Sequence, residues 1–380
     1  MSTLNKKRIA SMSGPQLVKY HILENYKVGQ KLPSDDMLSK KLGTSKYAAT
    51  RALAEMHSEG NIDRKPKMGS YLVSQLANDN SNITNNASQT KRIAFLSNEF
   101  DSFFCSELLW GVESACRSSQ HDLSLFNGDY SLENLKTNLL RIIEEKYDGA
   151  VVRLGECPED FALLDDVVPE DFPLVILDKS NEDMKFPCVK LNHENAAYDA
   201  VKHLIDLGHK EIAFVGYSHD NNFCMAEMER REEGYRRALK EAGLEMRPQY
   251  IQGGMHFSPG EKPTDSLLFS LGYEPMNKLL LQKEKPTAVF FINFTLAIGA
   301  LRAIRDHGLV MPDDISVITI DDDPATRFMT PSMSVIAQPL RSMGAAAIDI
   351  INNRFNNEVL PEKSVRLQGQ LIARDSTAKR

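Results

Sequence analysis

Seven short apolar runs, each followed by a longer segment with helical spacing, constrain the fold of this chain more than any other feature. They are RIAFLS, LSLF, GAVVRL, PLVILD, EIAFVG, TAVFFIN and ISVITID, all between Arg92 and Asp321. Strands with so few polar residues are typical of parallel sheets that helices cover on both faces. The pattern runs twice over residues 91–380, which predicts an α/β body of two doubly wound lobes with a cleft between them.

Composition excludes several classes of protein. No apolar run reaches about 18 residues, the length that a transmembrane helix needs, and the basic first residues lack the apolar core of an export signal. We therefore expect a soluble, cytoplasmic protein with no membrane partner. The five cysteines are odd in number and form no C-x-x-C pair, so reduced, packed thiols are expected, with no disulfide framework, no metal site and no cofactor.

Charge is distributed unevenly along the chain. Residues 1–75 hold 13 Lys and Arg against 6 Asp and Glu, a net +7, and the remainder holds 32 against 46, a net −14. A basic end on an acidic body suits contact with a polyanion. The Asn- and Ser-rich stretch between them cannot bury enough apolar surface to fold. The predicted organisation is a DNA-binding domain (1–75), a flexible linker (76–90) and an effector-binding and dimerisation domain (91–380).

Residues 14–73 show the pattern of three helices and a hairpin. Gly14 and Pro15 open the first helix, and Ser34 and Ser45 can cap the second and third. The third helix has an apolar face at helical spacing, formed by Ala49, Ala52, Leu53 and Met56, and an outward face with Tyr47, Thr50 and Arg51. The short runs NIDRK and SYLV are joined by the turn PKMG. Together these elements predict a winged helix-turn-helix.

Five ordered motifs make a resemblance specific: LPSD (32–35), LGTSK (42–46), TRAL (50–53), EGNI (59–62) and GSYLV (69–73). They resemble the DNA-binding head of GntR-family transcription regulators. The resemblance implies that the third helix enters the major groove and that the hairpin lies beside the minor groove. The DNA-contacting residues it implies are Ser34, Thr44, Ser45, Lys46, Tyr47, Thr50, Arg51, Lys65, Lys67 and Gly69. Asp36 stands where that family often has a basic residue.

Polar and aromatic residues follow the predicted strands of the body. Ligands of parallel sheets bind at the carboxyl ends of the strands. This rule selects residues 98–104, among them Asp101, Phe103 and Phe104, and also Arg153, Asp178, Lys179, Tyr217, Asn293 and Asp321. Phe103 and Phe104 could equally belong to the core. Trp110 is expected to take part in helix packing rather than in a cofactor site. Charged groups make directed hydrogen bonds to hydroxyls, so the set suits a sugar.

Most of residues 91–376 resemble the effector domain of the LacI family, itself related to periplasmic sugar-binding proteins. The resemblance rests on DSFFCSELLWGVE, YDGAVV, PLVILD, HLIDLGHKEIAFVG, RREEGYRRAL, PTAVFFIN, AIGALRAIRDHGLVMPDDISVITIDD, PSMSVIAQP and LIARDS. It implies that Phe103 and Phe104 give a sugar an apolar face and that Arg231, Asn293 and Asp321 bind its hydroxyls. A GntR-like head on a LacI-like body is similar to arabinose-repressor-type regulators.

Three classes of function compete for such a chain: a ligand-controlled repressor, a sugar sensor without DNA contact, and an enzyme. The basic head favours the repressor. The chain lacks a phosphate-binding P-loop, a metal-ligand set and a nucleophile with its base, which disfavours an enzyme. We predict a homodimeric regulator, a repressor that binds double-stranded operator DNA and responds to a sugar or sugar-like effector. A purine or nucleoside effector, and a cytoplasmic sugar sensor without operator binding, stay open as alternatives.

Overall fold

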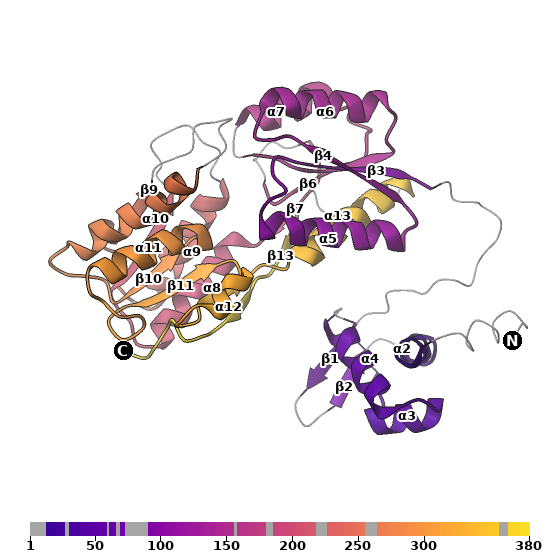
Figure 1. Ribbon diagram of the computed structural model, residues 1–380, viewed down its shortest axis with the longest axis horizontal. Helices are drawn as coiled ribbons and strands as arrows, with labels where there is room; N and C mark the ends of the chain where they lie inside the picture. The colour runs from indigo at the N-terminus through magenta and orange to yellow at the C-terminus, as the bar shows by residue number, and fades with distance from the viewer. Residues whose placement is uncertain are drawn as a thin grey trace, which may run out of the picture. The chain divides into compact units, whose positions relative to one another are not determined.

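The computed structural model of the protein describes residues 13–26, 30–58, 61–65, 69–72, 90–155, 158–179, 185–217, 226–254, 264–356 and 364–380. The chain divides into two compact units, Met1–Ser88 and Gln89–Arg380, which we name the head and the body. Residues 76–89 of the predicted linker lie outside the described residues. Figure 1 shows the described helices and the hairpin of the head, and two layered lobes in the body.

The head contains helices α2 (Gly14–Asn25), α3 (Asp35–Leu42) and α4 (Lys46–Ser58), followed by strands β1 (Ile62–Lys65) and β2 (Gly69–Leu72). The two strands are antiparallel, with Ile62 opposite Leu72 and Lys65 opposite Gly69. The predicted apolar face of α4 is buried, which confirms the helical spacing seen in the sequence. It packs in a small core of Val18, Ile22, Leu32, Leu38, Ala49, Ala52, Leu53, Met56, Ile62 and Leu72.

The first lobe of the body, which we name the N-lobe, is built on six parallel strands in the order β13-β7-β6-β5-β3-β4. The strands are β3 (Arg92–Ser97), β4 (Asp122–Asn127), β5 (Gly149–Arg153), β6 (Leu174–Leu177), β7 (Cys188–Leu191) and β13 (Ser364–Leu367). Its helices are α5 (Phe103–Ser118), α6 (Leu132–Glu144), α7 (Pro158–Val167) and α13 (Leu340–Phe355). Helices α6 and α7 cover one face of the sheet, and α5 and α13 cover the other (Figure 1).

The second lobe, the C-lobe, repeats this plan with the order β14-β12-β11-β10-β8-β9, in which only the β12–β14 pairing is antiparallel. The strands are β8 (Ile212–Tyr217), β9 (Ile251–Gly254), β10 (Ala288–Phe291), β11 (Ser316–Ile320), β12 (Ser334–Ala337) and β14 (Gln370–Ile372). The helices are α8 (His193–Asp206), α9 (Ala226–Glu241), the 3-10 turn η1 (Pro248–Tyr250), α10 (Asp265–Leu280), α11 (Phe294–Asp306) and α12 (Pro324–Phe328).

The predicted α/β fold with two parallel-sheet lobes is confirmed. All seven predicted strands are present, as β3, β4, β5, β6, β8, β10 and β11. Strands β7, β9, β12, β13 and β14 were missed because they are three or four residues long and, unlike the equally short β6 and β10, contain polar residues or glycine in place of a continuous apolar run. Helices begin where the sequence offers caps: Ser102 accepts from the Cys105 amide and Ser131 from the Asn134 amide.

The chain crosses between the lobes three times: from β7 to α8, from β12 to α13, and from β13 to β14. The crossings lie against one another. A Cβ atom on Gly369, in the third crossing, would lie 2.5 Å from Ile336 Cγ2 and 3.5 Å from Leu191 Cδ1. The amide of Asn192, in the first crossing, donates to the Leu367 carbonyl at 2.7 Å. Residues at these crossings are therefore placed to sense how the lobes are arranged.

Close helix packing fixes the rest of the N-lobe. A Cβ on Gly111 of α5 would lie 2.1 Å from the Arg341 carbonyl of α13, so only glycine permits this approach.

Three cysteines, Cys105, Cys116 and Cys188, are buried free thiols, as expected for the described part of the chain. Among the described helices, none is long and apolar enough to cross a membrane.

Candidate functional site

The carboxyl end of the N-lobe sheet carries a compact ionic cluster. Arg153, the last residue of β5, pairs with Glu99 at 3.0 Å (Nη1 to Oε1) and lies 3.6 Å from Asp178 (Nε to Oδ2). Glu99 also accepts hydrogen bonds from Ser102 at 3.0 Å and from Tyr130 at 2.5 Å. Burial and the bond to Glu99 raise the pKa of Tyr130, so its hydroxyl stays protonated and donates. The guanidinium of Arg153 is thereby held in one place.

Two aromatic side chains predicted to face a sugar open helix α5. Phe103 and Phe104 are both half-buried. Phe104 packs against the N-lobe core, and the guanidinium of Arg153 lies over its ring, 5.1 Å from the centroid. Phe104 therefore has a core contact and a contact with the ionic cluster. Asp101 is exposed, whereas Lys179, the second residue after β6, is buried.

Arg231 of α9 is buried at the C-lobe side of the site. Its Nη1 donates to the Ile292 carbonyl at 2.6 Å, and its Nε donates to His193 Nδ1 at 3.2 Å. Because Nδ1 of His193 accepts, the ring proton lies on Nε2. Burial lowers the pKa of His193 well below its ordinary value, and the positive charges of Arg231 and Lys179 add to this effect. His193 is therefore a neutral hydrogen-bond donor.

Asp321, directly after β11, lies beside Arg231. Its Oδ1 accepts a hydrogen bond of 2.6 Å from Nε2 of Gln338, in the second crossing. Burial raises the pKa of Asp321 above its ordinary value, while Arg231 and Gln338 oppose the rise and Asp178 adds to it. Asp178 belongs to the N-lobe, so the carboxylates that follow β6 and β11 lie close enough to interact across the lobes.

Asn293 holds the start of helix α11. Its Oδ1 accepts from the Leu296 amide at 3.0 Å, and its Nδ2 donates to the Tyr217 hydroxyl at 2.9 Å. Both polar ends of this amide are bonded within the C-lobe. Asn293 and Tyr217 were both selected from the sequence because they lie at the carboxyl ends of strands. The structure shows that their side chains are in contact.

The two lobes place an aspartate at equivalent positions with the same unusual backbone. Asp178 follows β6 with φ of 72°, and Asp321 follows β11 with φ of 85°. Left-handed φ is uncommon outside glycine, although aspartate tolerates it better than most residues. Such strain gathers at functional sites because the surrounding structure must hold it. The repeated geometry therefore marks these two carboxylates as parts of one site.

Nε2 of His193 and Oε1 of Gln338 are buried at this site and have no hydrogen-bond partner within the described part of the chain. The first is a donor, because Nδ1 accepts from Arg231; the second is an acceptor, because Nε2 of Gln338 donates to Asp321. Leaving such groups unpaired costs about 1–3 kcal/mol each. Hydroxyl groups of a ligand can accept from the first and donate to the second.

The sequence missed Glu99, Tyr130, His193 and Gln338 as individual site residues. Glu99 lay inside the range 98–104, but nothing singled out its carboxylate. His193 and Gln338 follow the short strands β7 and β12, which the periodicity did not reveal. Recognising those strands would have found both residues by the same rule that found Asp321.

The head presents a second candidate surface along helix α4. The predicted caps are present: Ser34 Oγ accepts from the Met37 amide at 3.4 Å, and Ser45 Oγ accepts from the Ala48 amide at 3.1 Å. Lys46, Tyr47, Thr50 and Arg51 are exposed, and Tyr47 is 76% exposed despite its large ring. Thr44 is half-buried just before them. An exposed aromatic ring among cationic residues suits contact with nucleic acid.

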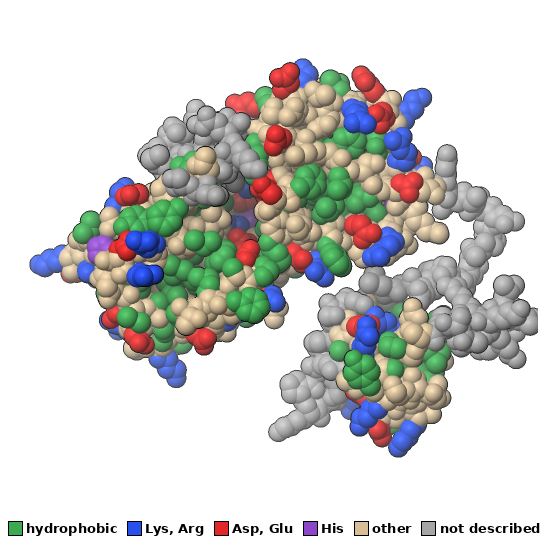
Figure 2. All heavy atoms as spheres, in the orientation of Figure 1, with side chains coloured by type: hydrophobic (Ala, Val, Ile, Leu, Met, Phe, Trp, Pro, Cys, Tyr) green, Lys and Arg blue, Asp and Glu red, His purple; other side chains and the backbone are tan. Residues whose placement is uncertain are grey.

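Three side chains on this surface, those of Lys46, Thr50 and Arg51, are each paired with a carboxylate. Thr50 Oγ1 donates to Asp35 at 2.7 Å, and Arg51 Nε pairs with Glu55 at 2.7 Å. Lys46 Nζ lies 3.3 Å from Asp36. Figure 2 shows basic side chains beside acidic ones on the drawn face of the head.

The hairpin is described only in part. Gly69 begins β2, opposite Lys65 of β1. The side chain of Lys65 and the whole of Lys67 lie outside the described residues.

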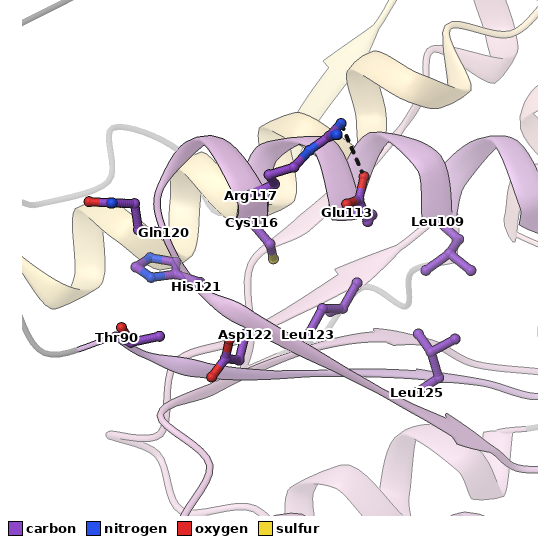
Figure 3. Close-up of a pocket in the computed structure, with 10 residues that line it drawn as sticks. All are labelled: Thr90, Leu109, Glu113, Cys116, Arg117, Gln120, His121, Asp122, Leu123 and Leu125. Carbon is purple, nitrogen blue, oxygen red and sulfur yellow. Dashed lines mark ion pairs between the residues drawn. The ribbon is translucent and has the colours of Figure 1, made fainter.

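A pocket of about 640 Å³ lies on the outer side of the N-lobe, between α5 and the edge strand β4 (Figure 3). In this view Leu109 and Leu125 lie at one end, Gln120 and His121 lie at the other, and Leu123 lies between them. Trp110 of α5 is 57% exposed, and its ring lies 4.7 Å from the guanidinium of Arg341 on the neighbouring helix α13. The lining of the pocket is mixed: Leu109, Cys116, Leu123 and Leu125 are apolar, and the remaining lining residues, Thr90, Glu113, Arg117, Gln120, His121 and Asp122, are polar or charged.

Comparison with known proteins places the body among transcription regulators. The sequence family described as "Periplasmic binding protein-like domain" matches residues 201–377. The chain is 32% identical over 287 residues to the HTH-type transcriptional repressor PurR of Histophilus somni (strain 129Pt), which covers 76% of this chain and 81% of that protein.

Solved structures agree on the fold. The transcription regulator CcpA of Lactococcus lactis matches with a TM-score of 0.64 and 24% identity, over 76% of this chain and all of that one. A regulatory protein of the LacI family from Chloroflexus aggregans matches with a TM-score of 0.63 and 24% identity, over 75% of this chain and 98% of that one. The names of these proteins describe regulators rather than enzymes.

The comparisons give no support to the GntR resemblance of the head. The names of the relatives describe HTH-type regulators, which is a statement about those proteins. The alignments cover about three quarters of this chain.

Proposed function

Because this chain belongs to the LacI family of transcription regulators, we propose that it binds operator DNA through its head and is controlled by a small polyhydroxylated effector held by its body. The observation that carries the proposal is the joint presence of two sites. One is an exposed basic and aromatic helix face in the head, and the other is a buried ionic site at the ends of both sheets.

The effector site combines the N-lobe cluster around Arg153 with Arg231 and Asp321 of the C-lobe. The orphaned donor of His193 and the orphaned acceptor of Gln338 support a ligand with hydroxyl groups. Both residues lie where the chain crosses between the lobes. A ligand that forms hydrogen bonds with both residues contacts two of the segments that connect the lobes. Its binding therefore favours one arrangement of the lobes over another. By linkage, operator and effector then change each other's affinity by the same factor.

The head acts, in this proposal, as a winged helix-turn-helix of the GntR type, with α4 in the major groove. The five sequence motifs, the antiparallel hairpin after α4 and the exposed Lys46, Tyr47, Thr50 and Arg51 support it. DNA contact places the protein's work in the cytoplasm. The regulator needs no catalytic residue, metal or cofactor.

The proposal includes a homodimer, since regulators with two-fold symmetry read paired half-sites. Trp110 and Leu125 are 57% and 53% exposed on the α5–β4 face. Exposed large apolar side chains of this kind mark interaction surfaces, and Figure 2 shows hydrophobic side chains gathered on the drawn face of both lobes. Substituting Trp110 and Leu125 by Glu should shift sedimentation to the monomer. The Val310→Glu variant, at an equally exposed apolar residue of the C-lobe, should stay dimeric.

The experiment that tests the proposal pairs a thermal-shift screen with DNA binding by the full chain. The screen contains pentoses, deoxyhexoses, uronates and nucleosides. The compound that raises the melting temperature should also change the affinity for DNA, and both effects should vanish in Asp321→Asn. A compound that stabilises the body and leaves DNA affinity untouched would favour a sensor without operator binding, and a response to nucleosides alone would favour the nucleoside alternative.

A further inference from the structure

The carboxylate of Asp36 lies between two lysines at the surface of the head. Its Oδ2 is 3.3 Å from Nζ of Lys40, and its Oδ1 is 3.3 Å from Nζ of Lys46. Lys40 lies one turn further along α3, whereas Lys46 opens α4. The two helices of the helix-turn-helix thus each supply one cation to the same carboxylate, and each cation takes a different oxygen.

This arrangement has the chemistry of a phosphate site. A DNA phosphate also offers two anionic oxygens, and lysine ammonium groups are phosphate binders. Lys46 first, and then Lys40, hold the pKa of Asp36 below its ordinary value, so the carboxylate is fully charged near neutral pH. The side chains of Asp36, Lys40 and Lys46 are 52%, 80% and 69% exposed, so another anion can reach the lysines.

The neighbouring acidic residue behaves in the same way. Asp35 accepts a hydrogen bond of 2.7 Å from Thr50, one turn beyond Lys46 on the outward face of α4. The first turn of α3 therefore places carboxylates on two of the groups that the proposed function assigns to DNA.

We propose that Lys40 and Lys46 together bind one phosphate of the DNA backbone, and that Asp36 occupies this phosphate site in the free protein. The inference rests on the proposed function, because it assumes that the head contacts DNA. Lys40 thereby joins the DNA-contacting residues, among which the sequence motifs did not place it. Asp36 acts as an internal competitor: it must leave the lysines before the phosphate binds, and it then repels the backbone.

Competition has a measurable signature. Removing the charge of Asp36 frees both lysines, so the affinity for any duplex should rise, with no requirement for a particular base sequence. An exposed ion pair is weak, so we expect a rise of about two- to fivefold at low salt. The plot of log affinity against log salt should steepen by up to about 0.9, the value of one added phosphate contact.

The test measures binding of the full chain to a fluorescent random-sequence duplex at about 50 mM salt and above. The variants are Asp36→Asn, Lys40→Gln, Lys41→Gln, and Asp36→Asn combined with each lysine substitution. Lys41 is the matched control, because it is an adjacent exposed lysine of α3 with the same charge. Melting temperatures check that each variant is folded.

The inference predicts that Asp36→Asn tightens binding, that Lys40→Gln abolishes this gain, and that Lys41→Gln preserves it. It is overturned if Asp36→Asn binds no tighter than the wild type, or if its gain is the same in the Lys40→Gln and Lys41→Gln backgrounds. Failure of the proposed function looks different: in that case the wild-type chain itself binds no duplex at low salt.

Discussion

The head and the body both place charged side chains at a candidate site, but they hold them in opposite ways. In the body, Arg231 is buried and the side chain of Arg153 is only 13% exposed, and both are bonded to groups within the folded lobes. In the head, Lys46 and Arg51 are exposed, and their carboxylate partners are at most half-buried. Buried charge networks are costly to disrupt, whereas exposed ion pairs contribute little to stability. The body is therefore built to be specific, and the head is built to exchange partners.

Among the substitutions that test this contrast between head and body, Arg231→Ala is expected to lower the unfolding free energy most. Arg231→Ala leaves His193 Nδ1, the Ile292 carbonyl and the Asp321 carboxylate without their buried cation, which costs about 3–5 kcal/mol of unfolding free energy. The measurement is chemical denaturation, followed by the thermal shift with the effector. Arg230→Ala is the matched control: this neighbour on α9 is half-exposed and pairs with Glu233 at 2.9 Å, so its change should stay within about 0.5 kcal/mol.

Equal stability of the Arg231 and Arg230 variants would contradict the view that the buried network carries the body's site. So would a normal effector response in Arg231→Ala, because the arginine would then lie outside the ligand's contacts.

A smaller effect is expected at Asp160, a buried carboxylate of α7. It accepts a hydrogen bond from the Gly155 amide at 2.9 Å, and burial raises its pKa to about 6. Since the folded state binds the proton more tightly than the unfolded chain does, this group stabilises the protein at low pH, and that stability is lost as pH rises towards 6. The loss amounts to at most about 3 kcal/mol.

The Asp160→Asn variant removes this titration. Its stability relative to the wild type should therefore increase between pH 4 and pH 7, a window that spans the shift of Asp160 from 3.8 to about 6. Denaturant midpoints at several pH values measure it. A wild type and variant whose stabilities stay parallel across this window would show that Asp160 ionises freely.

The smallest effect on stability is expected at Arg51, where the effect on DNA should be large. Arg51→Ala removes an exposed pair, so the melting temperature should hardly change, while DNA affinity should fall by about 1–3 kcal/mol. Arg141→Ala is the matched control, because Arg141 and Glu145 in the body form the same i,i+4 pair at 2.7 Å. If both variants bind DNA equally well, Arg51 lies outside the interface.

The sequence predicted the body's fold better than its site. Long apolar runs such as TAVFFIN can only be buried strands, and their order fixed the lobes. The contacts of Glu99 with Tyr130, and of His193 with Arg231, join residues 31 and 38 positions apart, and no local pattern encodes such pairs. In the head the helical spacing predicted which face of α4 is buried, but not that Asp35, Asp36 and Glu55 would hold the exposed face. The periodicity of a helix predicts which of its faces is buried. The ion-pair and hydrogen-bond partners of the exposed face depend on how neighbouring helices pack, which periodicity does not predict.

The central claim, that the head reads DNA as part of a symmetric regulator, is tested most directly by selecting binding sites for the full chain from a random duplex pool. The account predicts enrichment of two related half-sites in two-fold symmetry, separated by about one helical turn or a multiple of it. It also predicts loss of that enrichment in Arg51→Ala. A pool that remains random after repeated selection, with the wild-type chain folded throughout, would contradict it.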